Sequence, residues 1–328
     1  MISVLVTGAA TAIGERLCRS LIADTRVQHV LAVGTEGPDQ APPFSYGSRF
    51  TWLSVDLAKE RGIRELLFGP ARDLGVEVVV HLAQHGGAHD TGSRMHTANV
   101  EALRSILELV DRHPTIRRFV LKSYAEVYKV GLDLPVRVTE DQALDLSPQS
   151  PQYVRDRVEA DLTTCARMGL AQCELVVLRC AEALGPGTGS QLYDFLDAPV
   201  ALRLAGFDPM VNVATVADIV EALERALHGS GEGVFNIPGC DTLPLSEAIR
   251  KWGTRGIPLP GALVRPLYQL RHRLRGSEFS YGLNRRRLHY GLVLDGTRAR
   301  EELGYVPSHP VDWPNGGPIR VPEAPHAR

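Results

Sequence analysis

The sequence predicts an α/β protein built on a doubly wound parallel sheet, with a smaller part at its C-terminal end. Through residues 2–178, short apolar runs alternate with segments of helical period. Strands separated by helices of this length form βαβ units, and right-handed crossovers place helices on both faces of the sheet. After about Gly185 this rhythm changes and prolines become frequent, so the last third is expected to be a separate, loop-rich part.

The elements alternate from the first residues onward. Strands are expected over residues 2–6, 27–33, 50–55, 76–82, 119–121, 175–178 and 233–237. Helices are expected over residues 13–23, 58–74, 97–112, 152–168 and 217–227. In the second helix, Ile63, Leu66 and Leu67 recur on one stripe, which is the period of a half-buried helix. The run over 76–82 is almost continuously β-branched, which indicates a strand covered on both faces.

The composition narrows the class of protein and its partners. A 328-residue chain with 44% hydrophobic and 23% charged residues is an ordinary globular protein, and its net charge of −2 gives no reason to expect nucleic acid or an anionic membrane as partner. No charged segment precedes an apolar leader, and no apolar run reaches the length of a membrane span. The five cysteines include no C-x-x-C pair and form no framework of even count, which fits a reducing compartment. We therefore expect a cytoplasmic protein without a membrane span.

The C-terminal third is locally basic. Its arginines gather in two groups, which are Arg271, Arg273 and Arg275, and then Arg285, Arg286 and Arg287. A charge run of this kind is usually a solvated face. It also suits an anionic ligand or partner.

A glycine-bearing turn joins the first strand to the first helix. The strand runs into Thr7-Gly8-Ala9-Ala10-Thr11-Ala12-Ile13-Gly14. A turn in this place presents backbone N–H groups and the helix N-terminus to a pyrophosphate, and its small residues allow close approach. The position predicts dinucleotide binding. The alternative is a structural turn in a fold that has lost its cofactor.

From these residues onward the chain resembles the extended short-chain dehydrogenase/reductases of the NAD-dependent epimerase/dehydratase group. The family's T-G-x-x-G-x-x-G turn is matched at Thr7, Gly8 and Gly14, with Thr11 at the middle glycine. Further family marks follow in order over nearly the whole chain, at Asp56-Leu57, His81-Leu82-Ala83-Gln84, Asn99-Val100, Val127-Tyr128, Tyr153 to Arg157, Leu178-Arg179-Cys180, Ala217 to Ala222 and Glu301 to Tyr305. The resemblance implies a Rossmann fold with a small C-terminal substrate-binding cap.

The resemblance also implies a cofactor site. The family's cofactor positions fall at Gly8, Ala10, Thr11, Ala12, Ile13, Gly14, Thr35, Glu36, Asp56, Leu57, Leu82, Ala83, Gln84, Asn99, Arg157 and Cys180. The ribose-binding Asp of NAD enzymes falls at Thr35, with Glu36 one residue later, and no arginine there favours a 2′-phosphate. NAD is therefore expected, with NADP as the alternative. If Thr11 needs a positive φ, strain of roughly 1–3 kcal/mol follows, although its hydroxyl could instead bind a phosphate.

The implied catalytic set is a Ser or Thr, a Tyr and a Lys. The tyrosine, as proton-transfer group, falls at Tyr153, and the lysine at Arg157. Arginine keeps the charge that favours a phenolate, but its planar fork differs in shape from an ammonium. The serine position falls at Tyr124, while the adjacent Ser123 should point elsewhere on an extended segment. Tyr153, Arg157, Tyr124 and Ser123 are thus the candidate catalytic residues.

Three histidines, His81, His85 and His89, are spaced by four residues. A helix would place them on one face, but His81 ends a strand and Gly86-Gly87 breaks any helix, so no metal site is expected. His85 and His89, with Asp90 and Arg94, could line the substrate mouth, because this loop leaves the carboxyl end of a strand.

The resemblance divides the chain in two. Residues 1–184, completed by about 211–238, would form the NAD(P)-binding Rossmann domain, and residues 185–210 and 239–328 the substrate-binding cap. Two functions stay open: an enzyme that acts on a nucleotide-sugar or another alcohol/ketone substrate through Tyr153, and a catalytically impaired dinucleotide-binding module with a structural, sensory or interaction role. A homodimer through the helices over 97–112 and 152–168 is also expected. Their apolar stripe could face a partner or the sheet, and it includes Ile106, Leu109, Val158 and Leu162.

Overall fold

A computed structural model describes residues 1–35, 47–84, 86–276 and 278–315 of the protein. Two residues of the predicted site, Glu36 and His85, lie outside the described residues. Among the described helices, none combines the length and the apolar character that crossing a bilayer requires.

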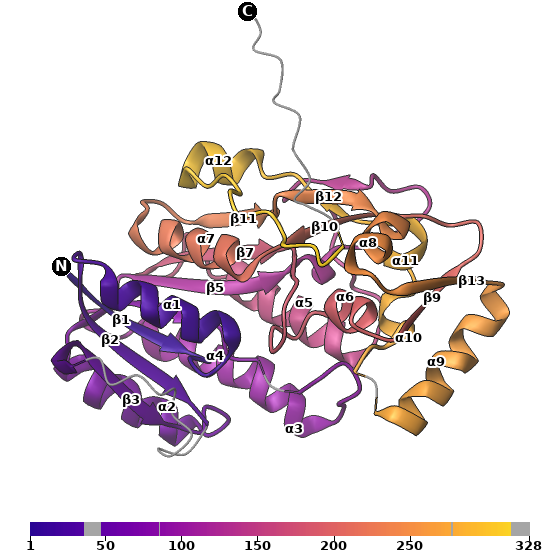
Figure 1. Ribbon diagram of the computed structural model, residues 1–328. Coiled ribbons are helices and arrows are strands. Elements are labelled where there is room, and N and C mark those ends of the chain that lie inside the picture. The colour runs from indigo at the N-terminus through magenta and orange to yellow at the C-terminus, as the bar shows by residue number, and fades with distance from the viewer. Residues whose placement is uncertain (36–46, 85, 277, 316–328) are drawn as a thin grey trace, which may run out of the picture.

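The centre of the molecule is a seven-stranded sheet in which every neighbouring pair is parallel (Figure 1). Its spatial order is β3-β2-β1-β4-β5-β7-β11. These strands are β1 Ile2–Thr7, β2 Val27–Gly34, β3 Phe50–Ser54, β4 Val76–His81, β5 Arg118–Tyr124, β7 Glu174–Cys180 and β11 Gly233–Ile237. Each strand predicted from the sequence is present, and the predicted doubly wound parallel sheet is confirmed.

Helices cover both faces of this sheet (Figure 1). Helices α1 (Ala12–Ala23) and α7 (Val216–His228) pack together on one face, while α2 (Glu60–Leu66), α4 (Ala102–Val110) and α5 (Gln152–Cys165) pack side by side on the other. Because side chains alternate along a strand, β1 contributes Val4 and Val6 to one hydrophobic cluster and Leu5 to the second. The sheet is therefore buried on both sides, as its β-branched strands require.

Two predicted helices are interrupted. The segment predicted as a helix over 58–74 contains α2 and then a wide turn over Leu67–Ala71, because Gly69 leaves helical φ/ψ next to Pro70. The segment predicted over 97–112 begins earlier, as α3 (Ser93–His96), and passes through a wide turn over Thr97–Glu101 before α4. Turns of this kind are frequent at functional sites.

The last third is more regular than the sequence predicts. Its strands form a three-stranded sheet and two strand pairs, in which β6 and β8 come from earlier in the chain. The sheet contains β8 Glu182–Ala183, β10 Met210–Ala214 and β12 Asp241–Pro244, and the pairs are β9 Val200–Leu204 with β13 Arg255–Leu259 and β6 Arg137–Val138 with β14 Val293–Leu294. Its helices are α6 Gln191–Leu196, α8 Leu245–Trp252, α9 Gly261–Arg275, α10 Tyr281–Asn284, α11 Arg287–Tyr290 and α12 Thr297–Leu303. Arginines and prolines hide the helical period there, as Pro266 does within α9.

A third hydrophobic cluster lies among these elements and includes Phe195, Tyr268 and Trp313. A separate core supports the proposed division into a dinucleotide-binding domain and a cap. Helix α12 packs against α7 and β11, next to the large sheet.

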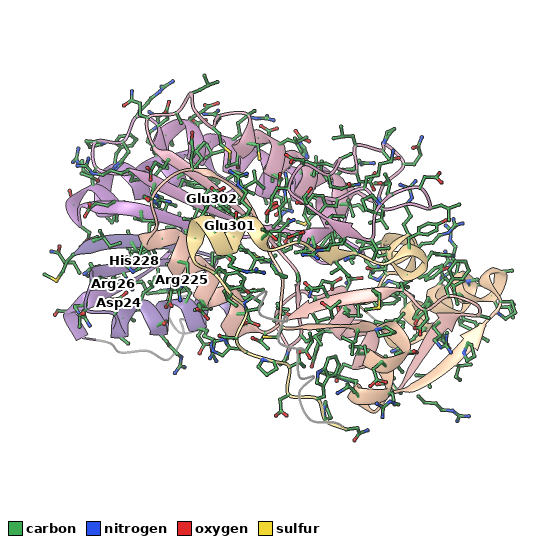
Figure 2. All side chains as sticks on the ribbon, turned by 90° about the horizontal axis from the view of Figure 1, so that it is seen from above. Asp24, Arg26, Arg225, His228, Glu301 and Glu302 are labelled. Atoms are coloured by element: carbon green, nitrogen blue, oxygen red, sulfur yellow. The ribbon has the colours of Figure 1, made fainter. Side chains whose placement is uncertain are left out.

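Polar contacts fasten α7 at both of its ends. Near its last turn, His228 lies 2.9 Å from a carboxylate oxygen of Asp24, which also pairs with Arg26 at 2.8 Å (Figure 2). The hydrogen bond from Arg26 holds the pKa of Asp24 below its ordinary value. In its first turn, the buried Asp218 accepts backbone N–H groups of Ser308 and His309, each at 3.0 Å. The segment after α12 is thereby tied to the large domain.

Candidate active site

The order of the strands reverses between β1 and β4, which opens a crevice at the carboxyl ends of these strands. The turn into α1 lies at this crevice. Gly8 has φ of +66°, and a Cβ there would lie 2.8 Å from the backbone nitrogen of Ala83. A Cβ on Gly14 would lie 2.3 Å from the carbonyl oxygen of Gly8. Both positions therefore require glycine, because a side chain would push the turn away from β4 or from the helix.

Thr11 is the N-cap of α1. Its φ is −72°, so the strain expected for a positive φ does not arise. Its Oγ1 accepts the N–H of Gly14 at 3.1 Å and donates to the carbonyl oxygen of Gly8 at 2.8 Å. This hydroxyl therefore closes the turn and caps the helix. The N-terminus of α1 and the small side chains beside it fit the pyrophosphate of a dinucleotide, which would lie against Ala10, Ala12 and Ile13.

The end of β4 forms the opposite wall of the crevice. The buried His81 lies with Nδ1 2.8 Å from Oγ1 of Thr7, and the N–H of Ala83 donates to the same hydroxyl at 3.4 Å. Leu82 and Gln84 line a cavity beyond this point. Asn99, in the wide turn before α4, lines a second cavity together with Gln84 and Ala83.

The remaining predicted cofactor positions are more scattered. Thr35 is exposed just after β2, and Leu57 is buried three residues after the end of β3. The carboxylate of Asp56 accepts the N–H of Ala58 at 3.1 Å and pairs with Lys59 at 3.2 Å. Cys180 is buried at the end of β7, where burial raises the pKa of its thiol to about 12. Its contact with a cofactor stays a prediction.

Tyr153, Arg157 and Tyr124 form one stacked unit. Tyr153 and Arg157 are one turn apart on α5, and the guanidinium donates a hydrogen bond to the Tyr153 hydroxyl. The guanidinium carbon lies 3.5 Å from the ring centroid of Tyr124 and 3.9 Å from that of Tyr153. Nη2 of Arg157 also donates to Oε1 of Gln84 at 3.0 Å. Cation–π contact on two rings fixes Arg157 beside the hydroxyl that the sequence assigns to proton transfer.

Ser123 is not part of this unit. Its hydroxyl donates to Oδ2 of Asp161 at 2.6 Å, and Asp161 forms an ion pair with Arg179 at 2.7 Å. All three side chains are buried. Alternation along β5 turns Ser123 away from Tyr124, so the structure assigns Ser123 to a buried polar network rather than to the catalytic set.

Two charged residues at the site escape the sequence analysis. Glu126 is buried and lies 3.1 Å from Nη1 of Arg157 and 3.5 Å from Nη1 of Arg287. Lys122 is also buried, with its ammonium 3.4 Å from the ring centroid of Tyr124. The sequence did contain a signal for both residues, which is a charged residue inside an otherwise apolar segment. Lys122 interrupts the apolar run of β5, and Glu126 directly precedes Val127-Tyr128. Buried charges of this kind mark functional sites more often than surface charges do.

Burial and the neighbouring charges together set the protonation state of Tyr153. Although burial opposes ionisation, Arg157 and Arg287 hold the pKa of Glu126 below its ordinary value, so this carboxylate is charged at neutral pH. Burial raises the pKa of Tyr153, Arg157 works against that rise, and Glu126 adds to it. Tyr153 therefore holds its proton at neutral pH.

Two cavities meet at the Glu126–Arg157 ion pair. The first contains Thr11, Lys122, Tyr153 and Arg157 and extends along the segment 187–189. The second lies between the large domain and the cap. It is lined by Glu126, Asp145, Ser147, Arg285, Arg286, Arg287 and Tyr290, among other residues.

The histidine-bearing loop after β4 lies against the cap. The ring of His89 stacks on that of His272 in α9, with centroids 3.8 Å apart. Asp90 accepts the N–H of Gly87 at 2.8 Å and so closes a turn. His81 is hydrogen-bonded to Thr7, His89 stacks on His272, and His85 lies outside the described residues. The two described histidines of this segment therefore have separate partners.

The carboxyl group of Asp194 on α6 makes the stability of the protein depend on pH. Burial raises its pKa from 3.8 to about 6, and Glu278 and Glu182 add to the rise. The folded state thus binds the proton more tightly than the unfolded chain, and wild-type stability falls as pH rises from about 4 to about 6. Asp194→Asn should match wild type below pH about 4 and be more stable by about 1 kcal/mol above pH about 7, after allowance for solvent screening. Urea unfolding at both pH values measures this, with the exposed Asp197→Asn as control. A difference that does not change with pH would contradict the assignment.

Comparison with known proteins agrees with this geometry. The model of the NAD dependent epimerase/dehydratase family matches residues 4–204. An uncharacterized protein of Mycobacterium tuberculosis is 32% identical over 313 residues, which cover 93% of this chain and 80% of that protein.

Crystal structures establish the likeness in fold. A dTDP-glucose 4,6-dehydratase from Bacillus anthracis, in complex with NAD, aligns with a TM-score of 0.70 at 18% identity and covers 94% of this chain and 92% of its own. A UDP-glucuronic acid 4-epimerase from Bacillus cereus, in complex with UDP-glucuronic acid and NAD, aligns with a TM-score of 0.68 at 20% identity, over 94% and 95% of the two chains. The predicted Rossmann fold is confirmed, as is NAD as the cofactor. With its glycine turn, its sheet and its sequence all matching, the chain belongs to the NAD dependent epimerase/dehydratase family and is an NAD-dependent enzyme.

Proposed function

We propose that the protein acts on a nucleotide-sugar, or on another alcohol/ketone pair, by epimerisation, dehydration or oxidoreduction. The observation that carries this proposal is the position of the Glu126–Arg157 ion pair between two cavities. One cavity adjoins the N-terminus of α1 and suits the cofactor, and the other is lined by arginines of the cap. A cofactor and an anionic substrate would therefore meet at Tyr153.

In this proposal Tyr153 exchanges a proton with the hydroxyl or carbonyl oxygen of the substrate. NAD, when bound, accepts or returns the hydride. Arg157 holds the phenol hydroxyl in place and supplies a positive charge that favours the phenolate. Glu126 is charged and buried, and its Oε2 has no hydrogen-bond partner within the described residues, so it is available to a polar group of the substrate.

The arginines of the second cavity suggest the class of substrate. Arg285 and Arg286 line it together with Ser147 and Asp145, and Nη1 of Arg286 lies 4.0 Å from Oδ1 of Asp145. Guanidinium groups bind the oxygens of a diphosphate through paired hydrogen bonds. A nucleotide-sugar carries its diphosphate between the base and the sugar, so these arginines would orient the sugar toward Tyr153.

The second candidate, a dinucleotide-binding module with little chemistry, would be a member of this enzyme family whose turnover is impaired. It is favoured by the raised pKa of Tyr153, because a phenol that keeps its proton is a poor base. The exchange of the family's lysine and serine for Arg157 and Tyr124 points the same way. Membership of an enzyme family and the intact Tyr153 favour the enzyme.

Calorimetric titration with NAD⁺, NADH, NADP⁺ and NADPH tests the proposal, followed by incubation with UDP- and dTDP-hexoses and chromatography of the products. We expect binding of NAD in preference to NADP, and new sugar nucleotides as products.

Gly14→Ala should weaken binding of NAD about tenfold or more, because the added methyl conflicts with the backbone of Gly8. Gly131→Ala is the matched control, since its methyl would meet only Leu134 at 3.7 Å. Equal binding by the two variants would contradict the proposed cofactor site, and NAD binding without turnover would favour the module.

Two further properties stay proposals. A homodimer through α4 and α5 has less apolar surface than the sequence suggested, because Ile106, Leu109 and Val158 are buried within the chain and only Leu162 of the four named positions is exposed. A cytoplasmic location is supported by the five cysteines, all of which are free.

A further inference from the structure

Helix α9 lies at the outer edge of the cap (Figure 1). Its inner side is well anchored. Val264 and Tyr268 are buried, and the Tyr268 hydroxyl exchanges hydrogen bonds of 3.0 Å with the backbone of Leu202 in β9. Arg271 donates to the carbonyl oxygen of Val200 at 2.9 Å. The helix is therefore a fixed part of the fold, and its exposed side chains project from a fixed backbone.

An exposed side of α9, about a quarter turn from its buried side, carries a leucine stripe formed by Leu263, Leu267, Leu270 and Leu274. These side chains are between 38% and 73% exposed. Their spacing of four, three and four residues places them on one face of the helix. They are four of the twelve large hydrophobic side chains that are exposed in the described part of the chain. Single exposed leucines need no explanation, but a stripe on one helix marks an interaction surface.

The charge of α9 indicates what this surface meets. The helix contains four arginines and one histidine and no acidic residue, although the whole chain has a net charge of −2. At about 100° per residue, Arg273 lies on one flank of the leucine stripe and Arg271 on the other. Arg273 is exposed, whereas Arg271 donates to the carbonyl oxygen of Val200. Arg265 is exposed on the opposite side of the helix, so the positive charge surrounds the helix and reaches the edge of the stripe at Arg273.

A second copy of this helix would fit poorly. Pairing of two α9 helices through their leucines would bring like-charged arginines together, which opposes association. An anionic lipid surface removes this repulsion, because leucines enter the interface while arginines stay at the level of the phosphates.

We propose that α9 docks the protein on an anionic membrane surface, with the leucine stripe buried in the interface. The helix lies on the surface and does not cross it. This proposal does not depend on the proposed substrate.

The position of α9 gives such docking a consequence for the site. Tyr268, on the inner side of α9, packs against Phe279 with ring centroids 4.8 Å apart. Phe279 lines an apolar cavity of the cap, together with Phe195 and Leu288, and this cavity extends to Glu182 and Arg287. Arg287 also contacts Glu126. A docked α9 would hold an apolar cavity and the candidate active site close to the lipid surface.

Vesicle sedimentation with the full chain tests the proposal. The probes are vesicles of phosphatidylcholine alone and vesicles in which about one quarter is phosphatidylglycerol. We expect the protein to bind the anionic vesicles at least about tenfold more tightly than the neutral ones, and added salt to weaken this binding. Leu270→Ser/Leu274→Ser should reduce the affinity about tenfold or more, because two inserted side chains become polar. Arg273→Glu should reduce it as well.

The matched control is Leu162→Ser/Leu170→Ser, which changes two exposed leucines outside α9 and should leave vesicle binding unchanged. Circular dichroism and unfolding curves establish that each variant is folded, which is expected because all four side chains are exposed. The proposal is overturned if the wild type does not bind anionic vesicles, or if the α9 variant and the control bind equally. It is also overturned if light scattering shows a wild-type dimer that the α9 variant converts to a monomer, because the stripe would then be a protein interface.

Discussion

Tyr153→Phe should lower turnover by about 100- to 10,000-fold while it leaves the affinity for NAD within about twofold. The change removes one oxygen and keeps the ring that stacks on Arg157, at 3.9 Å from the guanidinium carbon. The hydroxyl belongs to the cavity that adjoins the N-terminus of α1, and it carries its proton at neutral pH because burial holds its pKa above the ordinary value. In the direction that removes a proton from the substrate, the rate should therefore rise with pH on the alkaline side. Steady-state kinetics and calorimetry on the same preparations measure both effects.

Two other tyrosines provide the comparison. Tyr193→Phe, in α6 of the cap, should leave turnover unchanged. Tyr124→Phe keeps the ring that packs on Arg157 and removes only a hydroxyl, so a large loss there would assign the proton transfer to Tyr124 instead. Unchanged turnover in Tyr153→Phe would contradict the proposed mechanism.

Asp161→Ala should lower the free energy of unfolding by about 3–5 kcal/mol. Asp161 is fully buried in α5, and its carboxylate accepts hydrogen bonds from Ser123 at 2.6 Å and from Arg179 at 3.0 Å and 2.7 Å. Removal of the carboxylate leaves the Arg179 guanidinium buried without its counter-charge. Since a domain has a total stability of about 5–15 kcal/mol, this loss would be a large part of it. Urea unfolding followed by circular dichroism measures the change.

The control lies two residues earlier on the same helix. Glu159 pairs with Arg104 at 3.3 Å, but the Glu159 side chain is 44% exposed, so Glu159→Ala should cost less than about 1 kcal/mol. Asp161→Asn keeps the shape and removes the charge, and it provides a measurable variant if Asp161→Ala does not fold. Equal losses for Asp161 and Glu159 would show that the buried network does not stabilise the fold.

The large sheet could be predicted because its signals are local. Each strand is a short apolar run, and the strand over 76–82 is almost wholly β-branched, so pattern and environment agree. The interruptions of the helices at Gly69 and over Thr97–Glu101 were harder to predict, because a wide turn changes the hydrogen bonding without changing the hydrophobic period. The elements of the cap could not be predicted in this way, because frequent arginines and prolines such as Pro266 weaken the helical pattern. In α9 the apolar stripe is also exposed, so it is not the stripe of a half-buried helix.

The candidate site divides in the same way. Gly8, Gly14, Tyr153 and Arg157 could be predicted, because the motifs that contain them are contiguous. The contact between Glu126 and Arg287 joins segments that are far apart in the sequence, and no local pattern predicts it. The same holds for Lys122, whose position beside the Tyr124 ring follows from the alternation of β5 and from the packing of α5 above it.

The contacts of Arg157 with two tyrosine rings make positions 124 and 157 depend on one another. The guanidinium carbon lies over the ring of Tyr124 and over that of Tyr153, and the Tyr124 ring also receives the ammonium of Lys122. A planar cation at 157 and an aromatic ring at 124 therefore stabilise one another. Loss of the ring at 124 would leave buried cations with one aromatic contact fewer, so substitutions at 124 and 157 should have non-additive effects on stability.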